Sequence, residues 1–305
     1  MSNCCSRALI AIVSSGLFVT GLCGCQQPVS QKQEKSNITA AKAIPILQAK
    51  TLRRYIAQEA DQGVAVDLNY FYAVDNFLIA KYSKQSGDFI NKWEGTKEGP
   101  IQHLNSCYIN EAQLLCANSN YPEIPMASSI ETFNTSDLSH TGNYSLGVRD
   151  EGSLTWFSPY EDGWIAGFAH YSGEKGLPHK DTKYSSVITF DDEWRRTGGW
   201  MLPKSVTSRM SPYAASGGQI GPNGLLYLTG HDLPEMYALA LPTMGPKLMH
   251  ISTIELESRG QAFSFDPSGT GIVFAIDREK NLVLEIQLPN ADVLPVGGKR
   301  FSSGR

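Results

Sequence analysis

The feature that most constrains the fold of this chain is a phrase that recurs five times between Gln62 and Pro289. Each copy begins with Gly or a polar residue and an apolar strand. A turn with Asp, Asn, Pro or Gly follows, then a second, often aromatic strand and one or two outer strands. The copies span Gln62 to Trp93, His103 to Ser145, Gly152 to Leu202, Gly217 to Leu256, and Gly260 to Pro289. Units of about 40–50 residues with four short strands are typical of a β-propeller, whose blades bury their faces against one another.

We expect these repeats to form an all-β ring of five blades, with six blades as the alternative. The fifth copy, from Gly260 to Pro289, shows only three strand-like runs. The segment from Thr51 to Ala60 precedes the first copy and supplies a candidate outer strand, so that the two ends of the repeat region would close the ring together. A β-sandwich or another irregular all-β domain is the competing interpretation.

The chain has 305 residues, which at about 150 residues per domain would suggest two domains. The repeat instead predicts one propeller domain over residues 46–295, followed by a disordered tail over residues 296–305. Hydrophobic residues make up 41% of the chain, enough for a large buried core. The net charge is −4, and this lack of basic excess argues against nucleic acid as a partner.

The first residues have the pattern of an export signal. Arg7 is the only charged residue before an apolar run over residues 8–20, which is too short to span a membrane as a stable helix. The segment LCGC at residues 22–25 resembles the lipobox of bacterial lipoproteins, which implies cleavage before Cys25 and attachment of a lipid to Cys25. An ordinary signal peptide and an uncleaved anchor are the alternatives.

On that resemblance, residues 1–24 are a lipoprotein signal peptide and residues 25–45 are a flexible tether rich in Gln, Lys and Ser. The sorting rules of such lipoproteins imply the outer membrane when Gln26 follows the lipidated cysteine. We therefore expect a chain held in the bacterial cell envelope by the lipid on Cys25, at the outer membrane and facing the periplasm.

The cysteines fit an oxidising compartment. Four of the six lie in the expected leader or at the expected lipidation site, at positions 4, 5, 23 and 25. The remaining two, Cys107 and Cys116, flank a turn expected at residues 110–113, and in a hairpin turning there they would lie opposite each other. We expect a disulfide between them, with two buried free thiols as the alternative.

Two copies of the repeat carry insertions after their second strand, at residues 121–129 and 172–184. In a propeller the second strand returns to the face at which the innermost strand begins. The insertions and the entrances to the inner strands would therefore share one axial mouth, and we expect the functional surface there.

Polar side chains recur at this expected mouth, at the ends of second strands and the starts of first strands. The candidate ligand-binding residues are Asn105, Asn120, Lys180, Asp181, Ser216, Asp232, Gln261 and Arg278. The candidate catalytic residues are His103, His170, His231 and Asp277.

Four interpretations of these residues remain open. They could simply hydrogen-bond blade ends and channel water. The three histidines could bind a divalent metal ion as a possible cofactor. A histidine beside an acid, such as His231 beside Asp277 or Asp181, could act as a general base, with Lys180 or Arg278 stabilising an oxyanion. The ring could also bind a polar ligand or a peptide.

Two phrases, GPNGLLYLTGHD at residues 221–232 and FSFDPSGTGIVFAID at residues 263–277, resemble strand-turn-strand units of bacterial lactonase-like and quinoprotein-like propellers of the YVTN type. The resemblance covers residues 60–290 and implies the propeller fold. Some members of that broad group open lactones or isomerise cyclic acids, others bind a quinone, and many bind only proteins.

These features together predict a lipid-anchored envelope propeller that binds a small ligand or a protein partner at its axial mouth. One alternative is a lactonase-like or hydrolase-like enzyme with a His- and Asp-lined axial site. Another is a structural component of an envelope protein assembly.

Overall fold

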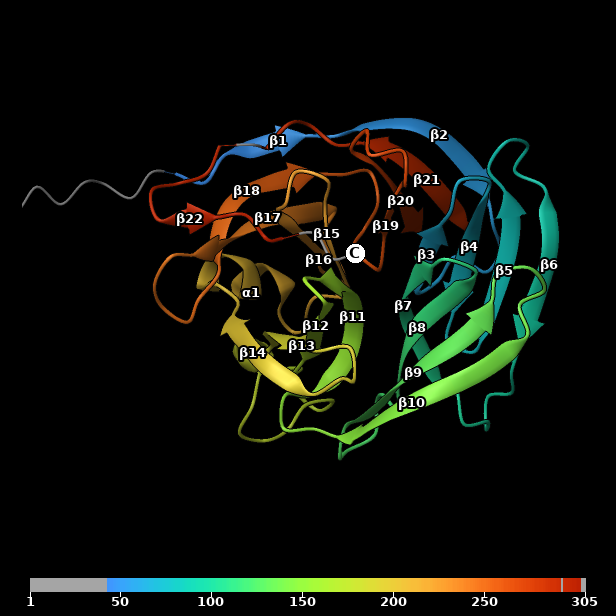
Figure 1. Cartoon of the computed structure of the whole chain (residues 1–305), viewed down its shortest axis with the longest axis horizontal. Coiled ribbons are helices and arrows are strands. Elements are labelled where there is room, and N and C mark those ends of the chain that lie inside the picture. Colours follow the sequence, from blue (N-terminus) through green and yellow to red (C-terminus); the bar gives the residue numbers. More distant parts are fainter. Residues whose placement is uncertain (1–42, 292, 303–305) are drawn as a thin grey trace, which may run out of the picture. The chain divides into compact units, whose positions relative to one another are not determined.

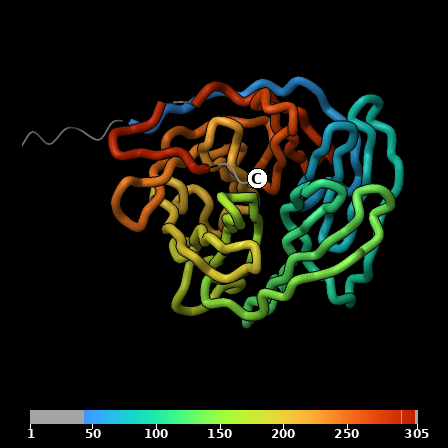
Figure 2. Tube along the Cα trace, in the orientation of Figure 1, coloured from blue at the N-terminus to red at the C-terminus, as the bar shows by residue number. Residues whose placement is uncertain are grey.

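The computed structural model describes residues 43–291 and 293–302. In these residues five sheets surround a common axis (Figure 1), which confirms the expected five-bladed β-propeller. We number the blades in chain order. The first strand of each of blades 1 to 4 lies innermost, and the later strands follow it outwards in antiparallel order, as the chain trace in Figure 2 shows.

Each blade coincides with one copy of the repeat. Blade 1 comprises β3 (Gly63–Val66), β4 (Tyr70–Asp75), β5 (Leu78–Ser83) and β6 (Phe89–Glu94). Blade 2 comprises β7 (His103–Asn110), β8 (Gln113–Ser119), β9 (Ala127–Asn134) and β10 (His140–Val148). Blade 3 comprises β11 (Ser153–Tyr160), β12 (Gly163–Ala169), β13 (Ser186–Phe190) and β14 (Arg196–Met201). Blade 4 comprises β15 (Gly217–Ile220), β16 (Leu226–Thr229), β17 (Glu235–Pro242) and β18 (Met249–Glu255).

Blade 5 is completed by the start of the domain, as the sequence predicts. Its inner strands are β19 (Ser264–Phe265), β20 (Ile272–Asp277) and β21 (Leu282–Gln287). The outer strand is β2 (Lys50–Ile56), which pairs antiparallel with β21. One residue of β2 points inwards: the side chain of Tyr55 is buried and its ring packs against Phe71 of blade 1 and Phe274 of blade 5. The closing strand therefore ties the last blade to the first.

Two short strands add to blade 4 in ways that the repeat does not predict. Strand β1 (Ile46–Gln48) pairs parallel with β18 at the outer edge of the blade. Strand β22 (Gly298–Lys299) pairs with the end of β17. Two helical turns connect strands elsewhere: the 3-10 turn η1 (Thr182–Tyr184) and the helix α1 (Lys204–Met210).

The expectation of a disordered tail from residue 296 is corrected for the described part of that tail. Besides forming β22, this segment buries Phe301, whose ring packs against Trp200 and Tyr160. This one aromatic side chain fills an apolar gap between blades 3 and 4. The tail was expected to be disordered because its other residues are mostly Gly, Lys, Arg and Ser.

The gaps between neighbouring blades hold the core. Trp156 of blade 3 is fully buried, and it fits only because Gly167 and Gly218 lie against its ring. A Cβ atom on Gly218 would lie 2.4 Å from that ring, so no larger residue is compatible with this packing.

The expected disulfide between Cys107 and Cys116 is present. The two residues are direct register partners in β7 and β8, with Cα atoms 4.0 Å apart, and both are buried. The bridge therefore joins the two innermost strands of blade 2.

The expected signal peptide, the lipidation site Cys25 and the tether up to residue 42 lie outside the described residues. Among the residues that are described, no helix has the length and apolar character needed to cross a membrane.

Candidate ligand-binding site at the axial mouth

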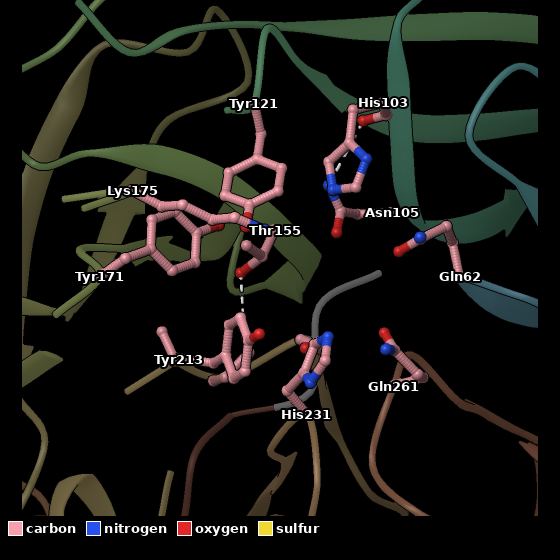
Figure 3. A pocket seen from close by; sticks show the side chains of 13 residues that line it. Gln62, His103, Asn105, Tyr121, Thr155, Tyr171, Lys175, Tyr213, His231 and Gln261 are labelled. Carbon is pink, nitrogen blue, oxygen red and sulfur yellow. Dashed lines mark hydrogen bonds between the residues drawn. The ribbon is translucent and has the colours of Figure 1, made fainter. Parts of the chain in front are cut away.

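A pocket of ≈ 140 Å³ opens on the axis, at the face where the inner strands begin. Figure 3 shows the side chains that surround it. It is lined by Gln62, His103, Asn105, Tyr121, Thr155, Tyr171, Lys175, Tyr213, Ala214, Ala215, Ser216, His231 and Gln261.

All five blades contribute to this pocket because each inner strand enters the ring at the same level. Gln62 precedes β3, His103 opens β7 and Thr155 lies in β11. Ser216 directly precedes β15, and Gln261 lies shortly before β19. Every blade thus contributes a polar residue at or near the start of its first strand to the axial pocket.

His103 is held as a neutral imidazole. Its Nδ1 lies 2.5 Å from Oδ1 of Asn76, whose own amide nitrogen donates to Asp75 at 2.8 Å. Nδ1 therefore carries the proton, and Nε2 is left as an acceptor. Burial lowers the pKa of His103 to about 4, with Asp75 opposing the shift and His231 adding to it.

His231 has the same arrangement on the other side of the pocket. Its Nδ1 lies 2.5 Å from a carboxylate oxygen of Asp232, and its ring stacks on Tyr213 with centroids 3.9 Å apart. Nη1 of Arg278 lies 3.4 Å from its Nε2. Burial lowers the pKa of His231, and Asp232 partly counters that effect. At neutral pH the pocket therefore presents two uncharged imidazoles.

Gln261 is the most unusual residue of the pocket. Its side chain is 1% exposed, and Nε2 has no hydrogen-bond partner among the described residues. Its backbone has φ +66°, in the left-handed region that favours glycine. Two hydrogen bonds hold the backbone there: the Gln261 backbone N–H donates to the Gly230 carbonyl, and the Thr229 hydroxyl donates to the Gln261 backbone carbonyl. A buried amide donor without an acceptor is destabilising, so the site keeps a group that a ligand could satisfy.

Three tyrosines and one lysine form the wall opposite Gln261 (Figure 3). Tyr121 packs on Tyr171 with centroids 4.9 Å apart and on His103 at 5.0 Å. The ammonium of Lys175 lies 5.5 Å from the Tyr121 ring, and its interaction with Tyr121 raises the pKa of Lys175. The lysine is the one permanently charged side chain of the lining.

The structure brings together several of the predicted site residues. His103, Asn105, Ser216, His231 and Gln261 line the pocket. Asp232 and Arg278 are not in the lining themselves and contact the two ring nitrogens of His231. The arrangement that the repeat predicted, with polar side chains of different copies gathered at one mouth, accounts for this set.

Other predicted residues lie elsewhere. His170 is buried and donates from Nε2 to the carbonyl of Asp150 at 3.0 Å. Lys180 binds the carboxylate of the same Asp150 at 2.6 Å, and Asp181 caps the turn η1 by accepting from the Lys183 amide. These three residues anchor the insertion at 172–184 rather than reach the axis.

The predicted role of Asp277 and the predicted metal site are corrected in the same way. The buried carboxylate of Asp277 pairs with Lys280 at 2.6 Å and lies outside the pocket lining. Across the part of the chain that the structure describes, no group of three His, Cys, Asp or Glu side chains is arranged to hold a metal ion. The His170 ring is turned to the carbonyl of Asp150 and lies outside the pocket lining, so the three histidines do not converge.

Sequence reasoning missed the aromatic half of the pocket. Tyr121 and Lys175 lie in the two insertions that were expected at the mouth, and that signal could have found them. Tyr213 lies between α1 and β15, a connection that has no counterpart in the other copies of the repeat. Comparison of equivalent positions in the repeat could therefore not identify Tyr213 as a pocket residue.

The opposite end of the axis carries a wider opening of ≈ 910 Å³, lined by the ends of the inner strands. Several of its polar groups are paired within the protein. Lys84 binds Asp266, Lys81 donates to the carbonyl of Thr135 at 2.8 Å, and the Tyr72 hydroxyl donates to Asp67 at 2.7 Å. None of the buried unpartnered polar atoms among the described residues lies in its lining, which distinguishes it from the pocket around Gln261.

Comparison with known proteins gives the fold. No protein-family model matches the chain, and no curated protein matches it. Among solved structures, the Myxococcus xanthus glutaminyl cyclase is similar with a TM-score of 0.53 and 10% identity, covering 80% of this chain and 97% of that one. U3-55K has a TM-score of 0.44 and 13% identity, covering 74% of this chain and 80% of that one. The Kuenenia stuttgartiensis hydrazine synthase has a TM-score of 0.41 and 10% identity, with 72% and 68% covered. The similarity to the cyclase supports the β-propeller fold.

Proposed function

We propose that this protein binds a small polar ligand in its axial pocket. The observation that carries the proposal is the buried amide nitrogen of Gln261, which has no partner among the described residues and whose backbone is held at a positive φ. Strained backbone and buried polar groups without partners both cost folding free energy, and they occur mainly at functional sites.

The lining defines the chemistry of the ligand. Nε2 of Gln261 and the Lys175 ammonium are donors and call for a carbonyl or carboxylate oxygen. The amide nitrogen of Gln62 already donates to Asp61 at 3.1 Å, so its carbonyl oxygen is left as an acceptor, together with Nε2 of His103. The ligand should therefore carry both an oxygen acceptor and an N–H or O–H donor.

The volume restricts its size. A pocket of ≈ 140 Å³ is smaller than the about 300–1,000 Å³ of sites that hold drug-sized ligands. A small amide, hydroxy acid or lactone fits this space, as does one polar end group of a larger molecule.

A thermal-shift panel tests this proposal. The full chain is heated with acetamide, glycinamide, lactate or γ-butyrolactone, each at increasing concentration. We expect at least one compound to raise the Tm, because a ligand that binds only the folded state stabilises it. Gln261→Ala should abolish that rise, whereas the exposed Gln58→Ala should keep it. A flat response to all four compounds would refute the proposal, as would an unchanged response of Gln261→Ala.

We further propose that the chain is a lipoprotein of the bacterial envelope, anchored through Cys25 at the outer membrane. The support is the sequence at residues 1–25, together with the disulfide in blade 2, which fits an oxidising compartment. Cells expressing the chain are grown with a radiolabelled palmitate precursor. The wild-type chain should take up label and Cys25→Ala should not; an unlabelled wild type, or label that survives the substitution, contradicts the anchor.

A lactonase-like or hydrolase-like activity is the second candidate function. The pair of His231 and Asp232 favours it, because the carboxylate holds the proton on Nδ1, so that Nε2, which Nη1 of Arg278 approaches at 3.4 Å, carries the lone pair that a general base needs. Hydrolysis of γ-butyrolactone is followed by acid release. Activity that is lost in His231→Gln and kept in the exposed His179→Gln would support this candidate; no acid release by the wild type would exclude it for this substrate.

A further inference from the structure

A second pocket lies between blades 1 and 2, away from the axis. It has a volume of ≈ 400 Å³, and its lining comes from the end of β6, the loop before β7, and strands β8, β9 and β10 (Figure 1). Asn120, which the sequence placed at the axial mouth, lines this pocket instead. The loop that begins at Tyr121 separates the two sites.

The floor of this pocket is a ladder of polar side chains across three strands. Asn118, Ser129 and Ser145 are successive register partners in β8, β9 and β10. Glu131 and Asn143 form the next pair along β9 and β10. Residues that pair directly share one face of a sheet, so these side chains form a continuous polar surface. The rest of the gap between blades 1 and 2 is filled by apolar side chains, as are the gaps between the other neighbouring blades, so the polar surface is confined to this pocket.

A buried carboxylate sits at the centre of this surface. Glu131 is 3% exposed and accepts from Ser129 at 2.5 Å and from His140 at 2.8 Å. The amide of Asn118 donates to Ser129 at 3.0 Å and extends the chain of hydrogen bonds. Burial of a carboxylate in a blade interface is unfavourable where an apolar residue would pack as well, so packing alone does not explain it.

An aromatic side chain lines the other side of the pocket. Opposite the polar ladder lies Trp93 of blade 1, a half-buried indole packed against Phe133 with centroids 4.8 Å apart. The pocket thus sets an apolar aromatic side chain against a surface of amide, hydroxyl and carboxylate groups.

From this geometry we infer that the pocket between blades 1 and 2 binds a neutral saccharide. A pyranose ring has an apolar C–H face that suits an indole, and hydroxyls that both donate and accept hydrogen bonds. Amides, hydroxyls and one carboxylate are matching partners for such hydroxyls. The lining contains no Lys or Arg, so a sulfated, phosphorylated or uronic sugar would meet Glu131 without a compensating cation.

The site is a binding site rather than a hydrolytic one. Glycoside hydrolysis uses two carboxyl groups that flank the bond to be cleaved. Glu131 is the one carboxylate in this lining, and both of its oxygens are engaged by Ser129 and His140.

Titration calorimetry on the full chain tests the inference with four neutral probes: maltotriose, cellotriose, chitotriose and mannotriose. At least one should bind with a Kd between about 10 µM and 1 mM, as expected for a small polar site. The double variant Asn143→Ala, Ser145→Ala should weaken that binding by at least about tenfold, since it removes direct partners of the hydroxyls. Both side chains are exposed, so this variant should fold normally.

Two controls keep the result specific. Thr141→Ala changes an exposed residue of the same strand outside the lining and should leave binding unchanged. Gln261→Ala should also leave it unchanged, because that residue belongs to the axial pocket. No binding of any probe would overturn the inference, and so would binding that the double variant retains. Binding of n-butylammonium in place of the sugars, abolished by Glu131→Gln, would instead identify a cation site.

Discussion

At the scale of single residues, the pocket depends on neutral histidines. His103 is kept uncharged by burial, and its proton is fixed on Nδ1 by Asn76 and, behind it, Asp75. A histidine whose pKa is lower in the folded state than in the unfolded chain makes stability depend on pH. Between pH 6.5 and about 4 the unfolded chain binds a proton at this position and the folded chain does not.

Stability should therefore fall as the pH falls through that window. For His103 alone we expect a loss of about 2 kcal/mol in the free energy of unfolding between pH 7 and pH 5. Urea denaturation at the two pH values measures it in the wild type and in His103→Gln. Because other buried histidines also titrate, the difference between the two proteins is the relevant quantity. Equal losses in both proteins would contradict the assignment of His103.

For Gln261, in contrast to His103, we expect the side chain to contribute little to the free energy of unfolding. Its Nε2 has no partner among the described residues, so Gln261→Ala removes no side-chain hydrogen bond from that nitrogen. We expect the free energy of unfolding to change by less than about 1 kcal/mol, measured in urea at pH 7. A loss of about 3 kcal/mol or more would show that the side chain is structural.

At the scale of elements, the ring is closed by one strand with one buried side chain. Tyr55 is 4% exposed in β2, whereas its neighbour Ile56 is 71% exposed. We expect Tyr55→Ala to lower the free energy of unfolding by about 3–5 kcal/mol, the usual cost of removing a buried aromatic side chain. Ile56→Ala, on the solvent face of the same strand, should cost less than about 0.5 kcal/mol. Similar costs for the two variants would mean that β2 does not close the ring.

The disulfide in blade 2 stabilises the hairpin formed by β7 and β8. Cys107 and Cys116 are nine positions apart, and a loop of that length gives about 2–3 kcal/mol of stabilisation in the chain-entropy treatment. Cys107→Ala combined with Cys116→Ala should lower the unfolding free energy by that amount under oxidising conditions. Under reducing conditions the difference from the wild type should disappear. A double variant as stable as the oxidised wild type would argue against a stabilising role for the bridge.

At the scale of the whole molecule, the repeat predicted the fold because its information is local. Each copy contains its own strands and turns, and stacking of neighbouring units follows from the need to bury both faces. The outer strand β2 was predictable because blade 5 lacked a fourth strand. Strand β22 and the burial of Phe301 were not, because a two-residue pairing and one aromatic contact leave no periodic pattern.

The polar residues at the strand ends of the site could be predicted from the repeat, whereas the tyrosines from the connecting loops could not. His103, Ser216 and Gln261 lie at or near the starts of first strands, and His231 follows the end of a second strand, so the repeat placed them together. His170 ends its strand at an equivalent position, but its ring turns to Asp150. Side-chain direction at a strand end depends on local partners and is not set by the repeat. The tyrosine wall comes from connections that differ between copies, and its assembly required the structure.

The central claim is that the axial pocket holds a small polar ligand through Gln261. An experimental crystal structure of the full chain soaked separately in acetamide, glycinamide, lactate and γ-butyrolactone tests it most directly. The account predicts electron density for at least one compound in the axial pocket, with its oxygen about 3 Å from Nε2 of Gln261, a hydrogen-bond distance. Soaked crystals in which none of the four compounds occupies the pocket, or in which a bound compound leaves that nitrogen unpaired, would contradict the claim.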